Sequence, residues 1–103
     1  MYTGVIVKES LSNIKALNKF QIISKTVVGP VNNTWELVKV NGTKKDIEGL
    51  KRYIKNGPWY ANFWTDKEII IVFKNNIITN RQKAIAYGLS IGIPQEQLDF
   101  KKD

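Results

Sequence analysis

Acidic side chains are the main candidates for catalysis in this chain, because it contains no His and no Cys. The absence of imidazole and thiol groups argues against a structural zinc site, a cysteine nucleophile and a histidine general base. Glu9 and Glu36 both lie in segments with strand character, so they could form an acid–base pair if one were buried. The sequence has no phosphate-binding loop, nucleophile elbow or dinucleotide-binding fingerprint. We assign no catalytic residue, metal or cofactor, and keep a small enzyme with a carboxylate pair as an alternative.

Positive charge is the second chemical feature. Sixteen Lys and Arg residues against nine Asp and Glu residues give a net charge of +7, which is typical of proteins that bind nucleic acid or another anionic surface. Lys44, Lys51 and Lys55 form one stripe of a predicted helix, with Arg52 beside it, and such a stripe can follow a phosphate backbone. AT-rich codon usage would enrich Lys in the same way. Nucleic-acid binding by this helix, residues 44–55, is therefore an alternative function.

Aromatic residues are concentrated in the stretch GPWYANFW, residues 57–64. In a strand, Tyr60, Asn62 and Trp64 would point to one side, because successive side chains alternate between the two faces. Tyr and Trp can bury a ring while keeping a polar tip hydrated, which suits an interface. We predict that Tyr60, Asn62 and Trp64 form an interface or ligand-binding surface. The competing interpretation is that the aromatic cluster only fills the core.

The elements that must position these residues follow from hydrophobic periodicity and turn residues. The sequence predicts strands at 2–9, 20–28, 34–40, 59–64, 69–73 and 77–78, a short helix or loop at 10–19, and helices at 43–56 and after 79. Thr43 with Asp46, and Thr79 with Gln82, have capping-box spacing. Gly92 precedes Ile-Pro, so we expect a left-handed helix end with positive φ there.

These elements predict an α+β fold with an antiparallel or mixed sheet of about five strands and two main helices packed on one face. A turn at residues 65–68 would pair Trp64 with Ile69 and Asn62 with Ile71, and both faces of that hairpin are apolar. The other face therefore needs a cover, which could be segment 11–19, the C-terminal tail, a second subunit or a ligand.

The 103 residues form one predicted domain, 1–103. No apolar run approaches the ~20 residues that span a bilayer, and the N-terminus lacks a secretory-signal pattern, so we expect a cytoplasmic protein that does not contact membranes. Residues 101–103 are expected to be disordered.

The leading hypothesis is a non-enzymatic interaction or ligand-binding domain that forms a homodimer, or binds another protein, through its aromatic sheet face.

Both ends of the chain carry a further pattern. The start has Tyr2, Gly4, Val5, Ile6, Glu9, Ser10 and Leu11, and the end reads YGLSIGIPQEQLDF, residues 87–100. The chain resembles a family of short, uncharacterised prokaryotic proteins with a Y-x-G-V-I-x-x-E-S-L start and a Y-G-x-S-x-G-I-P-x-x-Q-x-D-F end. No activity is assigned to that family. The resemblance implies a small cytoplasmic α+β domain and supplies no catalytic residues.

Overall fold

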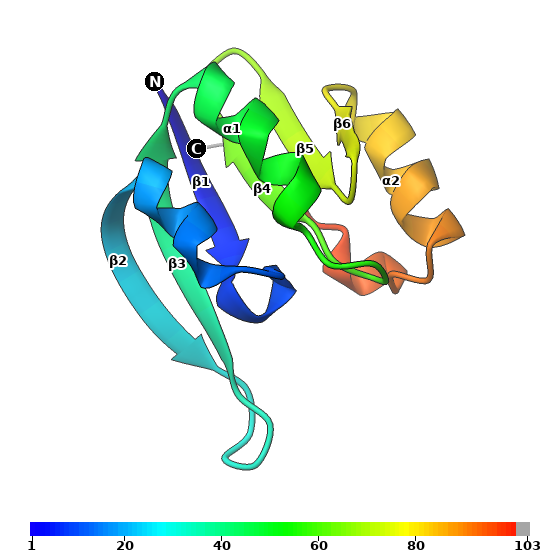
Figure 1. Ribbon diagram of the computed structural model, residues 1–103. Helices are drawn as coiled ribbons and strands as arrows, with labels where there is room; N and C mark the ends of the chain where they lie inside the picture. Colours follow the sequence, from blue (N-terminus) through cyan, green and yellow to red (C-terminus); the bar gives the residue numbers. More distant parts are fainter. Residues whose placement is uncertain (101–103) are drawn as a thin grey trace.

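A six-stranded antiparallel sheet in the order β2-β3-β1-β4-β5-β6 forms the centre of the computed structural model, which describes residues 1–100 (Figure 1). Its strands are β1 (Tyr2–Val7), β2 (Gln21–Val28), β3 (Trp35–Gly42), β4 (Ala61–Trp64), β5 (Ile69–Phe73) and β6 (Asn76–Ile78). The helices are α1 (Lys44–Leu50) and α2 (Arg81–Ser90), with 3-10 helices η1 (Lys8–Ser10), η2 (Ile14–Lys19), η3 (Lys51–Tyr53) and η4 (Gln95–Gln97). The α+β class is confirmed, with six strands instead of about five.

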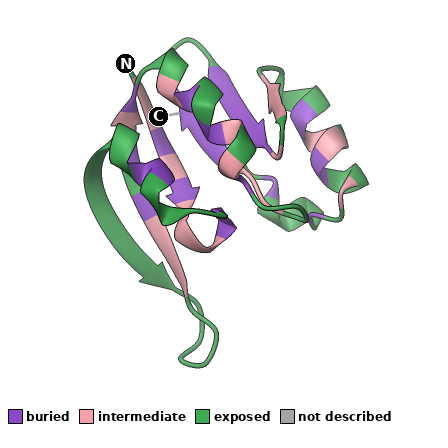
Figure 2. Cartoon of the chain, viewed as in Figure 1, coloured by how far each residue is buried: buried purple, intermediate pink, exposed green. Residues whose placement is uncertain are grey.

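The β4–β5 hairpin has the register expected from its turn. Trp64 lies opposite Ile69, and Asn62 lies opposite Ile71. The backbone N–H of Thr65 donates to the carbonyl of Glu68 at 2.9 Å and closes the turn. Every residue of β4 and β5 is buried, so this hairpin is covered on both faces (Figure 2).

One hydrophobic cluster covers the face of the sheet that carries Ile6 and Phe63, called here the first face. Ala16 and Leu17 of η2 and Ile47 and Leu50 of α1 pack against it, together with Leu11, Phe20 and Ile54. Figure 1 shows η2 and α1 lying side by side in front of the sheet. The apolar stripe of the first helix is therefore buried as its periodicity predicts.

A second cluster covers the opposite face, called the second face, and it corrects the expected helix arrangement. Ala84 of α2 packs there with Ile93, Leu98 and Phe100 of the C-terminal segment, against side chains that include Trp64 and Ile71. The two main helices thus lie on opposite faces. The physical reason is the strand pattern of β5, whose apolar side chains on both faces require cover on both sides.

The helix ends agree with the sequence in most details. Thr43 and Asp46 form the predicted capping box, in which each side chain bonds the other residue's backbone N–H. These hydrogen bonds with Thr43 hold the pKa of Asp46 below its ordinary value. The predicted helix 43–56 is shorter, since α1 ends at Leu50 and continues as η3. At α2 the cap is Asn80, which accepts from the backbone N–H of Lys83 at 3.0 Å, instead of Thr79.

Two glycines, Gly88 and Gly92, shape the C-terminal end of α2. Gly92 has a φ of +92°, as expected, and its N–H donates to the carbonyl of Leu89 at 3.2 Å. The N–H of Ile93 donates to the carbonyl of Gly88 at 3.0 Å, which completes a Schellman motif. A Cβ at Gly88 would lie 2.6 Å from Leu98, so glycine lets the C-terminal segment approach α2 closely.

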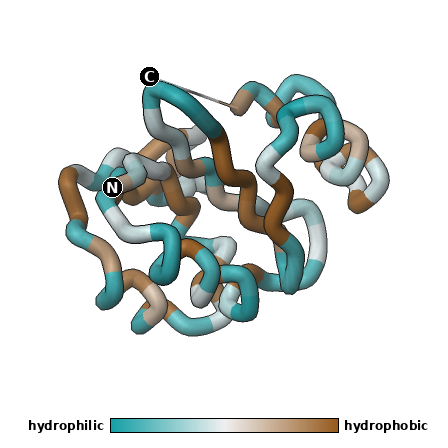
Figure 3. Tube along the Cα trace, turned by 90° about the horizontal axis from the view of Figure 1, so that it is seen from above, coloured by the Kyte–Doolittle hydropathy of each residue, from teal (hydrophilic) through white to brown (hydrophobic). Residues whose placement is uncertain are grey.

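Hydrophobic stretches run through the middle of the molecule, and hydrophilic stretches form most of its periphery (Figure 3). Within residues 1–100, none of the helices has the length and apolar character needed to cross a membrane. The expected disorder of residues 101–103 lies outside the described residues.

Candidate binding surface

The half of the second face nearer β2 and β3 lies largely outside the second cluster. The second cluster, which holds α2 and the C-terminal segment, contains no residue of β2 or β3. On that half the sheet presents Val7 of β1, Trp35 and Leu37 of β3, and Val28 of β2, next to Val5 of β1, which packs against the second cluster; all five are at least partly exposed. We call these five residues the open face. The strand order places it beside the covered half, because β1 is the neighbour of β4.

A concavity of about 470 Å³ lies over the open face. All five open-face residues line it, and its opposite wall comes from the β4 side and the C-terminal segment. The rings of Trp35 and Trp59 meet edge to face, with centroids 5.2 Å apart and planes at 70°. This volume falls within the range of ligand pockets, about 300–1,000 Å³, and its lining is mostly apolar, as is usual for a binding site.

Tyr60, Asn62 and Trp64, the predicted interface residues, all line this concavity. Their own chain buries much of them: Trp64 is 5% exposed, Asn62 is 7% exposed and Tyr60 is half-buried. The Tyr60 hydroxyl donates to the backbone carbonyl of Gln97, and its ring meets Phe100 edge to face at 5.3 Å. Burial, with the nearby Asp99 carboxylate, raises the pKa of Tyr60. These three residues thus form the inner wall, and their binding role stays a prediction.

Sequence reasoning missed the exposure of β2. All eight residues of this edge strand are exposed, and Figure 2 shows the strand uncovered along its whole length. The exposed apolar side chains of β2 are Ile22 (43%), Ile23 (49%), Val27 (64%) and Val28 (36%). Val28 also belongs to the open face, so the concavity reaches the edge of the sheet there, whereas Ile22 and Val27 lie opposite Val40 and Glu36 and point to the first face. The strand order, which the sequence does not reveal, is what leaves these side chains uncovered.

The predicted nucleic-acid residues lie around α1, and two of them interact within the chain. Lys51 forms an ion pair with Glu48 at 3.7 Å. Arg52 donates to the Tyr53 hydroxyl at 3.0 Å and lies 5.0 Å above the ring centroid. Lys44 and Lys51 line a second concavity of about 430 Å³ between α1 and the β5–β6 turn. Lys55, beyond η3, is exposed and does not line this concavity. The four cations therefore do not converge on one site.

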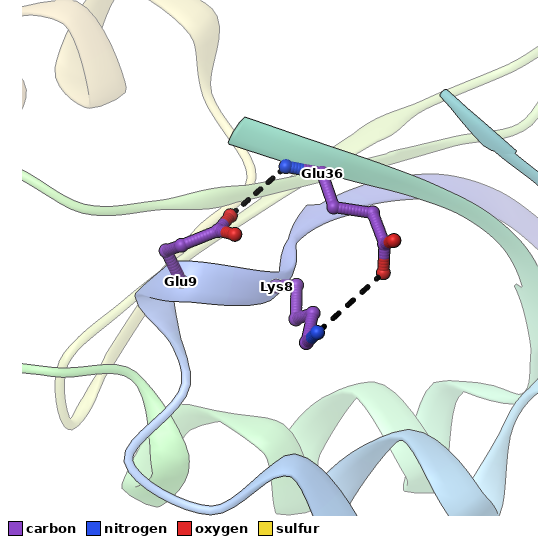
Figure 4. A network of polar contacts seen from close by, with 3 residues as sticks. All are labelled: Lys8, Glu9 and Glu36. Atoms are coloured by element: carbon purple, nitrogen blue, oxygen red, sulfur yellow. Dashed lines mark hydrogen bonds and ion pairs between the residues drawn. The ribbon is translucent and has the colours of Figure 1, made fainter. Parts of the chain in front are cut away.

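Glu9 and Glu36, the candidate catalytic carboxylates, come close in space but bind different groups (Figure 4). Glu9 Oε1 accepts from the backbone N–H of Glu36 at 3.0 Å, which anchors η1 to the start of β3. The Glu36 carboxylate instead lies 4.0 Å from the ammonium group of Lys8. Neither carboxylate lines either of the two concavities. Their geometry accounts for a structural contact and gives no support to an acid–base pair.

No family model matches the chain, and no curated protein or solved structure shows significant similarity to it. The resemblance of its two ends to short prokaryotic proteins stays a prediction.

Proposed function

We propose that the chain is a non-enzymatic binding domain that associates with a second copy of itself through the open face and the adjoining side chains of β2. One observation carries the proposal: the mostly apolar concavity of about 470 Å³ reaches the edge of the sheet at Val28, where the side chains of β2 are exposed. Contiguous apolar surface of this kind, rimmed by polar residues, marks interaction sites on soluble domains. Trp and Tyr side chains line the same concavity, and these residue types often contribute most of the binding energy at interfaces.

Tyr60, Asn62 and Trp64 have a revised part in this proposal. Because Trp64 is 5% exposed and packs among the residues of the second cluster, its replacement by Glu should unfold the chain instead of releasing a folded monomer. The contact with a partner is proposed for the more exposed residues, Val28 and Trp35, while Tyr60, Asn62 and Trp64 support the wall behind them.

The test is the mass of the particle, measured by light scattering over a dilution series. We expect wild-type mass to rise with concentration, and the Val28→Glu variant to remain monomeric, because a charge would then lie in the apolar contact. Ile14→Glu is the matched control: Ile14 is 53% exposed, lies on η2 and takes the same charge change outside the proposed surface. Association that both variants weaken equally would contradict the proposed location, and a wild type that is monomeric throughout would contradict self-association.

A further inference from the structure

We infer that β2 pairs edge to edge with β2 of a second copy, in antiparallel register around Thr26, so that the two sheets become continuous. This inference rests on the proposed self-association and specifies its geometry. The edge of β2 that faces away from β3 has no strand beside it, because β2 stands at the end of the strand order. Figure 1 shows no segment of the described chain outside it. An edge strand presents a row of unpaired N–H and C=O groups, which is a template for another strand.

The composition of β2 favours pairing along this edge. Seven of the eight residues in QIISKTVV are uncharged, and Lys25 is the one charged side chain. The strand contains no proline, which would remove a backbone donor. A register shift interrupts its pairing with β3 between Ile22 and Ser24. The regular part available for pairing is therefore residues 24–28.

The side chains of this segment select the register. A pair centred on Lys25 would set two like charges directly opposite each other, which is destabilising. A pair centred on Thr26 places Thr26 opposite Thr26, Lys25 opposite Val27 and Ser24 opposite Val28. Threonine pairs are favourable across strands, and no like charges meet. Thr26 and Val28 lie on the same face as Leu37 and Trp35, their partners on β3, so the open faces of both copies would adjoin.

The area available predicts a weak, reversible dimer and favours a second copy as the occupant. The five residues 24–28 extend about 17 Å at ~3.4 Å each, and such an edge buries roughly a few hundred Å² per copy, below the ~800 Å² of a standard interface. The adjoining apolar side chains Val27 and Val28 add to this area from both copies at once. Lys25 is the only charged side chain on β2, so this strand offers a different protein little charge for specific recognition.

Charge exchange at Thr26 tests the inference. Thr26→Lys and Thr26→Glu each place like charges opposite each other in the proposed pair, so each alone should dimerise several-fold more weakly than wild type. An equimolar mixture of the two should regain dimer as a heterodimer. Circular dichroism of each variant confirms folding, which an exposed edge position should preserve. Unchanged dimerisation of both variants would overturn the inference while leaving the proposed function in place.

A cysteine provides an independent readout, because the chain has no other thiol. Under mild oxidation, Thr26→Cys should form a disulfide-linked dimer, since the two Cα atoms of a directly opposed pair lie within disulfide range. Val31→Cys, at a position that is 95% exposed beyond the end of β2, reports random collisions. A mixture of Ser24→Cys and Val28→Cys chains should cross-link more than either chain alone. Equal cross-linking at 26 and 31 would refute the register, and a monomeric wild type at every concentration would refute the inference together with the proposed function.

Discussion

Replacing Gly4 by Ala should destabilise the chain through one identifiable contact. Gly4 lies in β1, between β3 and β4, and the ring of Phe63 covers it. A Cβ at Gly4 would lie 2.2, 2.5 and 2.8 Å from three atoms of that ring, so the ring must move. Phe63 is fully buried and stacks on Phe20 with centroids 5.7 Å apart. Phe20 in turn lies over Gly42, where a Cβ would be 2.5 Å away. The ring therefore has no free space to enter.

The size of the effect follows from two opposing terms. Overpacking a well-packed core costs about 1–3 kcal/mol, and the loss of glycine's freedom in the unfolded chain offsets about 0.4–1 kcal/mol of it. We expect Gly4→Ala to lower the free energy of unfolding by about 1–2 kcal/mol. The free energy of unfolding is measured by urea unfolding, followed by tryptophan fluorescence and circular dichroism. If the slope of this free energy against urea concentration is unchanged, only the stability has changed.

Two further variants isolate the contact. Gly49→Ala is the matched control, because a Cβ there meets nothing within 4 Å and Gly49 lies inside α1. It should stabilise by up to about 1 kcal/mol through helix propensity. Phe63→Leu should cost less in the Gly4→Ala background than in wild type, since removal of the ring relieves the clash. A Gly4→Ala protein as stable as wild type, or additive double-variant energies, would refute the reasoning.

Three other predictions concern the end of α2, the capping box of α1 and nucleic-acid binding. Gly92→Val should cost about 1–2 kcal/mol from backbone strain alone, because a Cβ at Gly92 meets nothing within 4 Å while φ is +92°; an unchanged thermal midpoint would contradict this. Asp46→Asn should destabilise at neutral pH and have no effect in acid. The pKa of Asp46 is lowered in the folded state, so its contribution is present above the unfolded pKa and is lost as the pH falls through the folded pKa; a pH-independent difference would show that the carboxylate charge is not responsible. Short DNA and RNA should show no binding in fluorescence anisotropy at ~50 mM salt, where phosphate contacts are least screened, whereas affinity that falls with salt and with charge reversal at Lys51, Arg52 and Lys55 would establish the nucleic-acid alternative.

Local signals in the sequence were sufficient for several elements. The four-residue turn fixed the β4–β5 register, because a hairpin loop of known length allows few pairings. Thr43 and Asp46 formed the predicted capping box, and Gly92 took the predicted left-handed conformation. Each of these features depends on residues only a few positions apart.

The strand order and the exposure of β2 could not be predicted from the sequence, because they depend on pairing between residues that are far apart in it. The placement of β1 between β3 and β4 brings Val5 opposite Lys39 and Asn62, residues that are 34 or more positions away in sequence. The same strand order leaves β2 at the edge of the sheet. Its apolar residues are therefore exposed, although their sequence pattern is that of an ordinary buried strand. The prediction that both helices share one face was wrong because hydrophobic periodicity does not assign a helix to one of the two apolar faces of β5, and α2 covers the second face. The C-terminal segment, through Leu98 and Phe100, supplies part of the second cover.

Sedimentation equilibrium at low and high salt tests the central claim, self-association through the open face and β2, most directly. The chain has a mass of 11.8 kDa and a net charge of +7, so two copies repel each other and added salt should strengthen an apolar dimer by screening that repulsion. We predict a mass that rises toward twice 11.8 kDa with concentration, more steeply at ~500 mM than at ~50 mM salt, and a Val28→Glu variant that stays at 11.8 kDa. A wild-type mass of 11.8 kDa at every concentration and both salt levels would contradict the account.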